Sequence, residues 1–199
     1  MMQLFVLAVA AGLAIGIGGT AFLTIPNKIV GAVLFTVGLY TICLHGLALF
    51  TGKVGCAVEQ PVSYWQDLAV IWLGNLVGTF IAAQAILATR CAGIAQTALA
   101  MSKIKLADNY ISLLILGVFC GMLMYIAVEG YKKCQNPLIL VACVAGFILC
   151  GFEHCIADMF YFSIAGVWSV DALLIILVIT VGNSIGGMLI PAIKRCCKS

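Results

Sequence analysis

Charged side chains are scarce in this chain, where Asp, Glu, Lys and Arg make up 9% of 199 residues and hydrophobic residues make up 64%. A water-soluble domain needs more polar surface than this composition supplies. The basic residues do not cluster and the net charge is only +3, so the sequence predicts no nucleic-acid partner. The apolar runs are continuous rather than alternating, which argues against a transmembrane β-barrel and favours an all-α, multi-pass membrane protein.

The sequence also lacks the spacing patterns of a metal centre or an enzyme active site. None of its ten cysteines forms a C-x-x-C pair, and no Cys/His spacing resembles a zinc site. It has no nucleotide motif and no nucleophile–base pair. We therefore expect no cofactor and no metal, and a membrane-bound redox enzyme subunit using Cys and His is only a distant alternative.

Six apolar segments are long enough to cross a bilayer, which takes about 20 helical residues. Short polar or proline-containing stretches separate them, so residues 1–199 are expected to form a single transmembrane domain. The start of the chain carries no basic side chain, and we expect the first segment to be retained and not cleaved as a signal peptide. The expected segments are Leu4–Ile25, Ile29–Phe50, Asp67–Ala88, Tyr110–Val128, Pro137–Phe162 and Asp171–Ile193.

An even number of spans places both termini on one side of the membrane. Six basic residues would lie on that side and four on the other, and this excess predicts cytoplasmic termini in the inner (cytoplasmic) cell membrane. The terminal side holds Lys53, Lys132, Lys133, Lys194, Arg195 and Lys198, and the other side holds Lys28, Arg90, Lys103 and Lys105.

The two halves of the chain carry the same small motif. Residues Gly74–Gly78 in the third segment and Gly182–Gly186 in the sixth both read Gly-Asn-x-aliphatic-Gly, at an offset of 108 residues. Three spans per half is an odd number, so the second half would be inverted across the membrane relative to the first. Glycines at this spacing let helices pack closely.

The second and fifth segments contain polar interruptions. Thr51-Gly52 and Gly151 are expected to break these helices, and the ionisable residues Glu153 and His154 follow the second break. Ionisable groups at membrane depth are costly, and they usually face a pore, a cavity or a partner. Paired broken helices at equivalent positions indicate a translocation site. The alternative is that His154 is an ordinary hydrogen-bonded core residue.

With these residues in view, the chain resembles the formate/nitrite transporter family from its second segment through its sixth. Leu49–Gly52 is similar to that family's first signature, Gly151–Ala157 to its second, and Trp72–Gly78 to its third helix. The resemblance implies an aquaporin-like protomer of six transmembrane helices, built as an inverted 3+3 repeat with broken second and fifth helices. It also implies a homopentamer in the lipid bilayer, in which each protomer is an ion channel for a small monovalent anion or its conjugate acid, and not an enzyme.

The resemblance assigns expected roles along the substrate pathway. His154 would be the central histidine, and Thr51 the threonine of the other broken helix. Lys105, in the loop before the fourth helix, would attract the anion, although the residue alone favours an ordinary interfacial lysine. The apolar constrictions would fall on Phe35, Leu39, Leu49, Phe50 and Phe147.

Three other polar residues are expected to have structural roles. Asn75 and Asn183 would tie the broken segments together through hydrogen bonds between helices. Glu153 would cap the backbone amides of a broken helix, because carboxylates suit helix N-termini.

Three residues depart from the pattern of the resembled family. Ala48 replaces an acidic residue, Asp158 stands where Asn is usual, and Gly121 stands where a pore-side Asn is frequent. We expect Asp158 to be structural. Formate is the expected substrate, and nitrite and hydrosulfide are alternatives because all three are small monovalent anions with weak conjugate acids.

Overall fold

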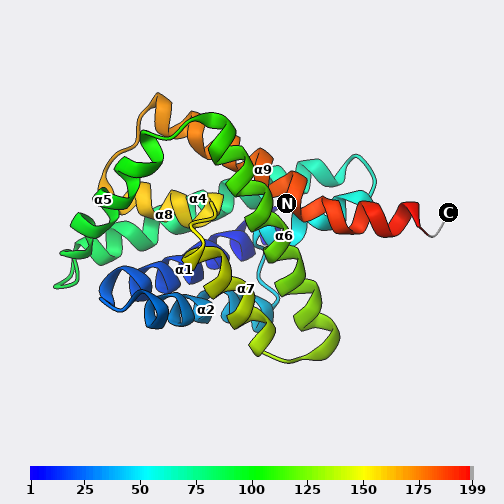
Figure 1. The fold of residues 1–199 in the computed structure, drawn as a ribbon, viewed down its shortest axis with the longest axis horizontal. Coiled ribbons are helices and arrows are strands. Elements are labelled where there is room, and N and C mark those ends of the chain that lie inside the picture. Colours follow the sequence, from blue (N-terminus) through cyan, green and yellow to red (C-terminus); the bar gives the residue numbers. More distant parts are fainter. Residues whose placement is uncertain (198–199) are drawn as a thin grey trace.

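The computed structural model describes residues 1–197, and this part of the chain is built from helices (Figure 1). Lys198, counted above on the terminal side, lies outside the described residues. Within the described range, five helices are long and apolar enough to cross a membrane. They are α1 (Met2–Thr24), α2 (Lys28–His45), α4 (Tyr64–Leu87), α6 (Tyr110–Cys134) and α9 (Val170–Cys196).

The remaining apolar helices complete the spans that the sequence predicts to be broken. The short helix α3 (Phe50–Lys53) and the 3₁₀ turn η1 (Val54–Val58) follow α2, whereas α7 (Leu138–Leu149) and α8 (Cys155–Ala165) together form the fifth span. The expected all-α membrane fold with interrupted second and fifth segments is therefore confirmed.

The two interruptions have the same backbone geometry. Gly46 has a φ of 65° and Gly151 a φ of 72°, a left-handed conformation that favours glycine. The amide that follows each of these glycines bonds back to the preceding helix. Leu47 N–H donates to Ile42 O at 3.0 Å, and Phe152 N–H donates to Phe147 O at 2.9 Å. The expected break at Gly151 is therefore confirmed.

The expected break at Thr51-Gly52 is wrong by several residues. Helix α2 ends before Gly46, and both Thr51 and Gly52 lie inside α3. The physical reason is that Gly46 alone adopts the left-handed conformation, whereas Thr51 and Gly52 take up helical geometry once the chain has turned.

Glycines allow α1 to pack closely on α4, and α6 on α9. A Cβ added to Gly78 would lie 2.9 Å from Gly12 Cα, and a Cβ added to Gly186 would lie 2.8 Å from the carbonyl carbon of Val118. Real Cβ atoms do not approach backbone this closely, so these helix pairs depend on glycine. The two pairs are equivalent in the two halves of the chain, in agreement with the repeat in the sequence.

The same packing accounts for the glycine at position 121, where the resembled family often has an asparagine. A Cβ on this residue would lie 2.8 Å from Asn183 Cα, so position 121 faces the backbone of α9 and has no room for a side chain. This departure from the family pattern therefore goes with the close packing of α6 on α9.

The polar stretch before the fourth span is partly helical. The sequence reading treats residues 90–109 as a connection, but it contains α5 (Ile94–Leu106), which packs against α8. Lys105 therefore lies in the last turn of a helix and not in a loop. Figure 1 shows α5 at one end of the molecule and the C-terminal end of α9 at the other.

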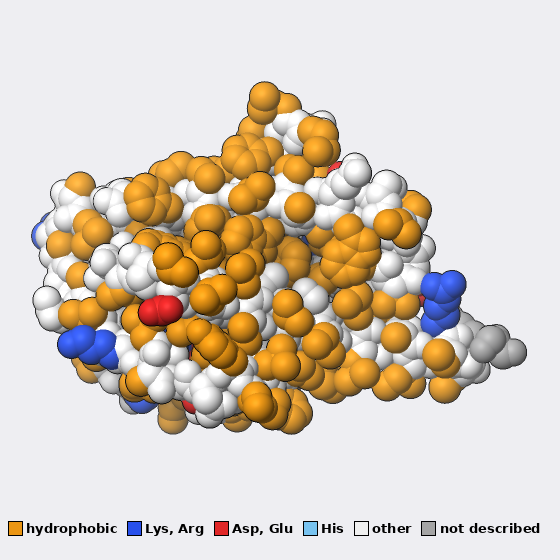
Figure 2. All heavy atoms as spheres, turned by 90° about the horizontal axis from the view of Figure 1, so that it is seen from above, with side chains coloured by type: hydrophobic (Ala, Val, Ile, Leu, Met, Phe, Trp, Pro, Cys, Tyr) orange, Lys and Arg blue, Asp and Glu red, His pale blue; other side chains and the backbone are white. Residues whose placement is uncertain are grey.

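The outward surface of the spans is apolar. Figure 2 shows a face covered by hydrophobic side chains, with Lys and Arg toward the two ends. Large exposed hydrophobic residues include Val37, Leu73, Phe80, Ile115 and Val181. Such a belt suits contact with lipid or with neighbouring membrane helices.

We expect Gly186→Ala to destabilise the protein by about 1–3 kcal/mol, because the added methyl group overlaps the α6 backbone. Thermal unfolding of the purified protein in detergent measures the effect. Gly93→Ala is the matched control: nothing lies within 4 Å of its added Cβ, so its stability should stay close to wild type. Equal melting temperatures for both variants would contradict the close packing of α6 on α9.

Candidate functional site

Asn75 satisfies the backbone of the first break. Its side-chain oxygen accepts a hydrogen bond from Phe50 N–H at 2.9 Å, at the start of α3. Its side-chain nitrogen donates to Ala48 O at 2.9 Å and to Ala8 O at 2.8 Å. One fully buried amide thus serves a helix N-terminus, the break and helix α1.

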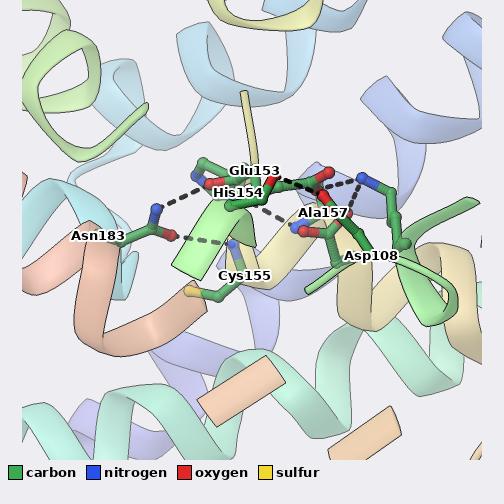
Figure 3. Close-up of polar contacts among 9 residues, drawn as sticks. Asp108, Glu153, His154, Cys155, Ala157 and Asn183 are labelled. Carbon is green, nitrogen blue, oxygen red and sulfur yellow. Dashed lines mark hydrogen bonds and ion pairs between the residues drawn. The ribbon is translucent and has the colours of Figure 1, made fainter. Parts of the chain in front are cut away.

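Asn183 makes the equivalent three bonds at the second break. It accepts from Cys155 N–H at 2.9 Å, and donates to Glu153 O and Gly117 O, both at 2.8 Å. Figure 3 shows the Asn183 amide facing Glu153 and Cys155. Because Phe50 and Cys155 bond the equivalent asparagines, Leu49 is the counterpart of His154.

His154 links the two breaks. Its Nε2 lies 2.9 Å from Thr51 Oγ1, and its Nδ1 accepts a hydrogen bond from Ala157 N–H at 3.1 Å, capping α8. A neutral ring with Nδ1 as acceptor carries its proton on Nε2, which then donates to the Thr51 hydroxyl. The hydroxyl proton of Thr51 is then available for a hydrogen bond to a third group. An imidazolium could not accept the bond from Ala157.

Apolar side chains surround this polar pair. The Phe147 ring stacks on the His154 ring with centroids 5.5 Å apart, and Phe35 meets Phe147 edge-on at 6.1 Å. Leu49, Thr51 and His154 are each no more than 2% exposed. The junction between the breaks is therefore narrow, buried and apolar apart from one imidazole and one hydroxyl.

A cavity lies on each side of this junction. The larger, of about 700 Å³, is bounded by the α1–α2 corner, α5 and the break before α8, and Phe147, His154 and Lys105 line it. We call it the far cavity. The smaller, of about 70 Å³, is lined by Leu49, Gly46 and Lys53 among others, on the side of the termini.

Lys105 is held by two carboxyl groups at the floor of the far cavity. Its Nζ pairs with Glu153 Oε2, and lies 3.0 Å from Asp158 Oδ1. Burial alone would lower the pKa of Lys105, but Asp158 and Glu153 outweigh it and raise that pKa above its usual value. The side chain is therefore a fixed ammonium ion at this site.

The structure changes the expected role of Glu153. Its side chain pairs with Lys105 and caps no backbone amide, because His154 caps α8 in its place. The geometric reason is that the Glu153 backbone carbonyl already faces Asn183, which directs its side chain toward α5.

The predicted constriction residues separate into two groups. Phe147 stacks on His154 and Phe35 meets Phe147 edge-on, whereas Leu49 is buried two residues before Thr51 and lines the smaller cavity. Leu39 and Phe50 are also buried, at 1% and 5% exposure, but they line neither of the two cavities. Their role in a pathway stays a prediction.

Sequence reasoning missed several residues around the far cavity. Phe22, Pro26, Thr97 and Tyr161 line it, from α1, the corner after α1, α5 and α8. The contact of Asp158 with Lys105 was also missed. The signal in the sequence for this contact is a polar segment beside a broken span. Spacing does not reveal that Lys105 and Asp158, which are 53 positions apart, will meet.

A model of the formate/nitrite transporter family matches residues 1–195. The chain belongs to this family. Formate/nitrite transporter proteins are channels and transporters, so this chain is not an enzyme, and the redox-subunit alternative falls.

Individual relatives agree with this assignment. The formate channel FocA of Haemophilus influenzae is 30% identical over 67% of this chain and 52% of its own length. FocA of Escherichia coli K12 is 29% identical over 80% of this chain and 65% of its own length. The chain thus spans between about half and two thirds of these curated relatives.

A solved structure has the same fold over almost its whole length. A pentameric formate channel with formate bound superposes with a TM-score of 0.87 and 25% identity, covering 98% of this chain and 96% of that chain. The two proteins therefore share one fold over nearly all of this chain.

We expect Asn183→Ala to cost at least about 2 kcal/mol of stability, because it leaves a buried amide and the Glu153 carbonyl group without partners and removes a further bond to Gly117 O. The matched control is Asn136→Ala, which removes one exposed bond to Leu138 N–H and should cost about 1 kcal/mol or less. Denaturation in detergent gives both values. An Asn183→Ala variant as stable as Asn136→Ala would mean that water replaces the amide.

Proposed function

We propose that the protein is a membrane channel for small monovalent anions or their conjugate acids, with formate as the leading substrate. The observation that supports this most directly is the junction of the two broken spans. There, one imidazole–hydroxyl pair, His154 with Thr51, lies in an apolar wall beside a large cavity that holds a fixed ammonium ion.

The physics of this arrangement favours passage as a neutral acid. Lys28 and Lys105 both line the far cavity, and ammonium groups there raise the local concentration of anions. A bare anion would lose most of its hydration between Leu49 and Phe147, and apolar walls do not replace it. Protonation removes most of that cost, because a neutral molecule is far less strongly hydrated.

The central pair would then serve the protonated molecule. Nε2–H of His154 and the hydroxyl of Thr51 supply hydrogen bonds at the narrowest point, where no water remains to make them. A formic acid molecule has one donor and two acceptor oxygens, which matches a site that both donates and accepts. Passage would thus be assisted by protonation and completed at His154.

Assembly and orientation complete the proposal. The apolar outer belt and the pentameric relative support a homopentamer in the lipid bilayer, with one pathway in each protomer. The excess of basic residues on the terminal side supports cytoplasmic termini in the inner membrane. Reagents that label cysteines from one side only would test the orientation at Cys134, which is exposed.

Uptake into proteoliposomes tests the function. The purified protein should take up formate, and a panel of formate, nitrite, hydrosulfide, acetate and lactate identifies the preferred substrate. If nitrite or hydrosulfide uptake exceeded formate uptake, the proposal of an anion channel would stand and its leading substrate would change. No uptake of any of the five would overturn the proposal.

We expect His154→Asn and His154→Ala to reduce formate uptake alike, since both lose Nε2. Only His154→Ala should lose about 1 kcal/mol of stability, because Asn retains an acceptor for Ala157 N–H. His45→Asn, at an exposed position, is the matched control and should behave like wild type. Normal uptake by His154→Asn would show that Nε2 takes no part in permeation.

We expect Phe147→Ala to admit larger acids, because its ring fills the space between His154 and Phe35. The ratio of lactate to formate uptake should rise by about tenfold, in line with the loss of a steric barrier of roughly 1.4 kcal/mol. Phe80→Ala removes an outward-facing ring from α4 and serves as the control. An unchanged ratio in Phe147→Ala would mean that the pathway runs elsewhere.

A further inference from the structure

The charges at the floor of the far cavity do not balance. One ammonium, Lys105, faces two carboxyl groups, Glu153 and Asp158, and the three side chains are 11%, 8% and 2% exposed. If both carboxyls were ionised, this cluster would carry a net negative charge at the floor of a cavity that is to collect anions. A buried negative charge without a partner is also unfavourable in itself.

Asp158 has an oxygen that the ion pair does not use. Its Oδ1 lies 3.0 Å from Lys105 Nζ, while its Oδ2 is buried and has no hydrogen-bond partner among residues 1–197. An ionised carboxylate oxygen in this position lacks both water and a donor. A carboxyl oxygen that carries a proton, or shares one with a neighbouring acid, removes this cost.

Within residues 1–197, no cation other than Lys105 pairs with either carboxyl. The helices packed on α8 are α1, α4, α5 and α9, and α1 has no charged residue, while α4 and α9 carry theirs in their end turns. Besides Lys105 and Glu153, the titratable groups within electrostatic reach of Asp158 are Cys120, Cys155 and Tyr161. Lys28 and the neutral His154 line the same cavity.

We propose that Glu153 and Asp158 share one proton beside Lys105, and that this proton is transferred to the anion entering the far cavity. This inference rests on the proposed function and names the group that supplies its proton. Glu153, the more exposed of the two acids, delivers the proton. Asp158 is a positioning residue, because its buried charge makes the pair bind a proton at all.

The transfer is balanced. The O–H bond of the shared carboxyl breaks, and a new O–H bond forms on an oxygen of the anion, which leaves as the neutral acid toward Phe147. The cluster is left with one net negative charge, which attracts a proton from the solution in the far cavity and restores the resting state. His154 need not release a proton, so its Nδ1 keeps the bond from Ala157.

Asp158→Asn tests the inference, because it leaves one ammonium and one carboxylate with no proton to share. Uptake of formate by the variant is divided by wild-type uptake at each pH, so that protonation of the substrate itself cancels. The ratio should be below one at about pH 5.5, because the variant has no shared proton to donate. It should rise at least about threefold by about pH 8, because the variant lacks the second carboxylate that repels anions in wild type. For Asp158→Glu, which keeps both carboxyl groups, the ratio should not change with pH. The same is expected for Asp171→Asn, the matched control at an exposed position.

Infrared spectroscopy of the lipid-embedded protein provides a second measurement that does not depend on transport. Wild type near neutral pH should show the carbonyl stretch of a protonated carboxylic acid, and Asp158→Asn should lose it while Asp171→Asn keeps it. A flat uptake ratio for Asp158→Asn, or no such band in wild type, would overturn the shared proton. If wild type takes up no anion while the band is present, the proposed function fails and the shared proton stands.

Discussion

Every feature of this protomer depends on one constraint: backbone amides and carbonyls at membrane depth must have partners. A continuous helix would pair these groups within itself, but two spans are interrupted. The side chains of Asn75 and Asn183 make the backbone hydrogen bonds that are lost at the interruptions. Each bonds a helix N-terminus, the break before it and a neighbouring helix. Without them, the breaks would expose unsatisfied groups, and the polar junction between the cavities would have no support.

The backbone at the two breaks makes the same hydrogen bonds in both halves, whereas the side chains at equivalent positions differ. Ala48 and Glu153 both offer a carbonyl to the equivalent asparagine, yet only Glu153 brings a carboxyl group. Leu49 and His154 are likewise equivalent positions with opposite chemistry. The far cavity therefore holds an acid pair and the central imidazole beside its lysines, whereas the lining of the small cavity includes lysines but no acid or imidazole. The repeat has in this way produced two cavities whose chemistry differs.

The spans, the breaks and both asparagines could be predicted, because hydropathy and the Gly-Asn-x-aliphatic-Gly repeat depend on local sequence. The exact break before α3 could not, since it depends on which glycine adopts a positive φ. Helix α5 was missed because its 13 residues mix polar and apolar side chains. The contact of Lys105 with Asp158 joins residues far apart in the chain, and the residue type alone favours an interfacial lysine.

The hydrogen bonds of His154 constrain where a proton can come from. Nδ1 accepts from the backbone and caps α8, so charging the ring would remove the cap from a buried helix end. Nε2–H is then a hydrogen-bond donor of fixed direction and a poor source of protons. A pathway that needs a neutral acid must obtain its proton before the junction, where the chain has gathered two carboxyl groups around one ammonium. Capping and proton supply are thus divided between adjacent residues, His154 and Glu153.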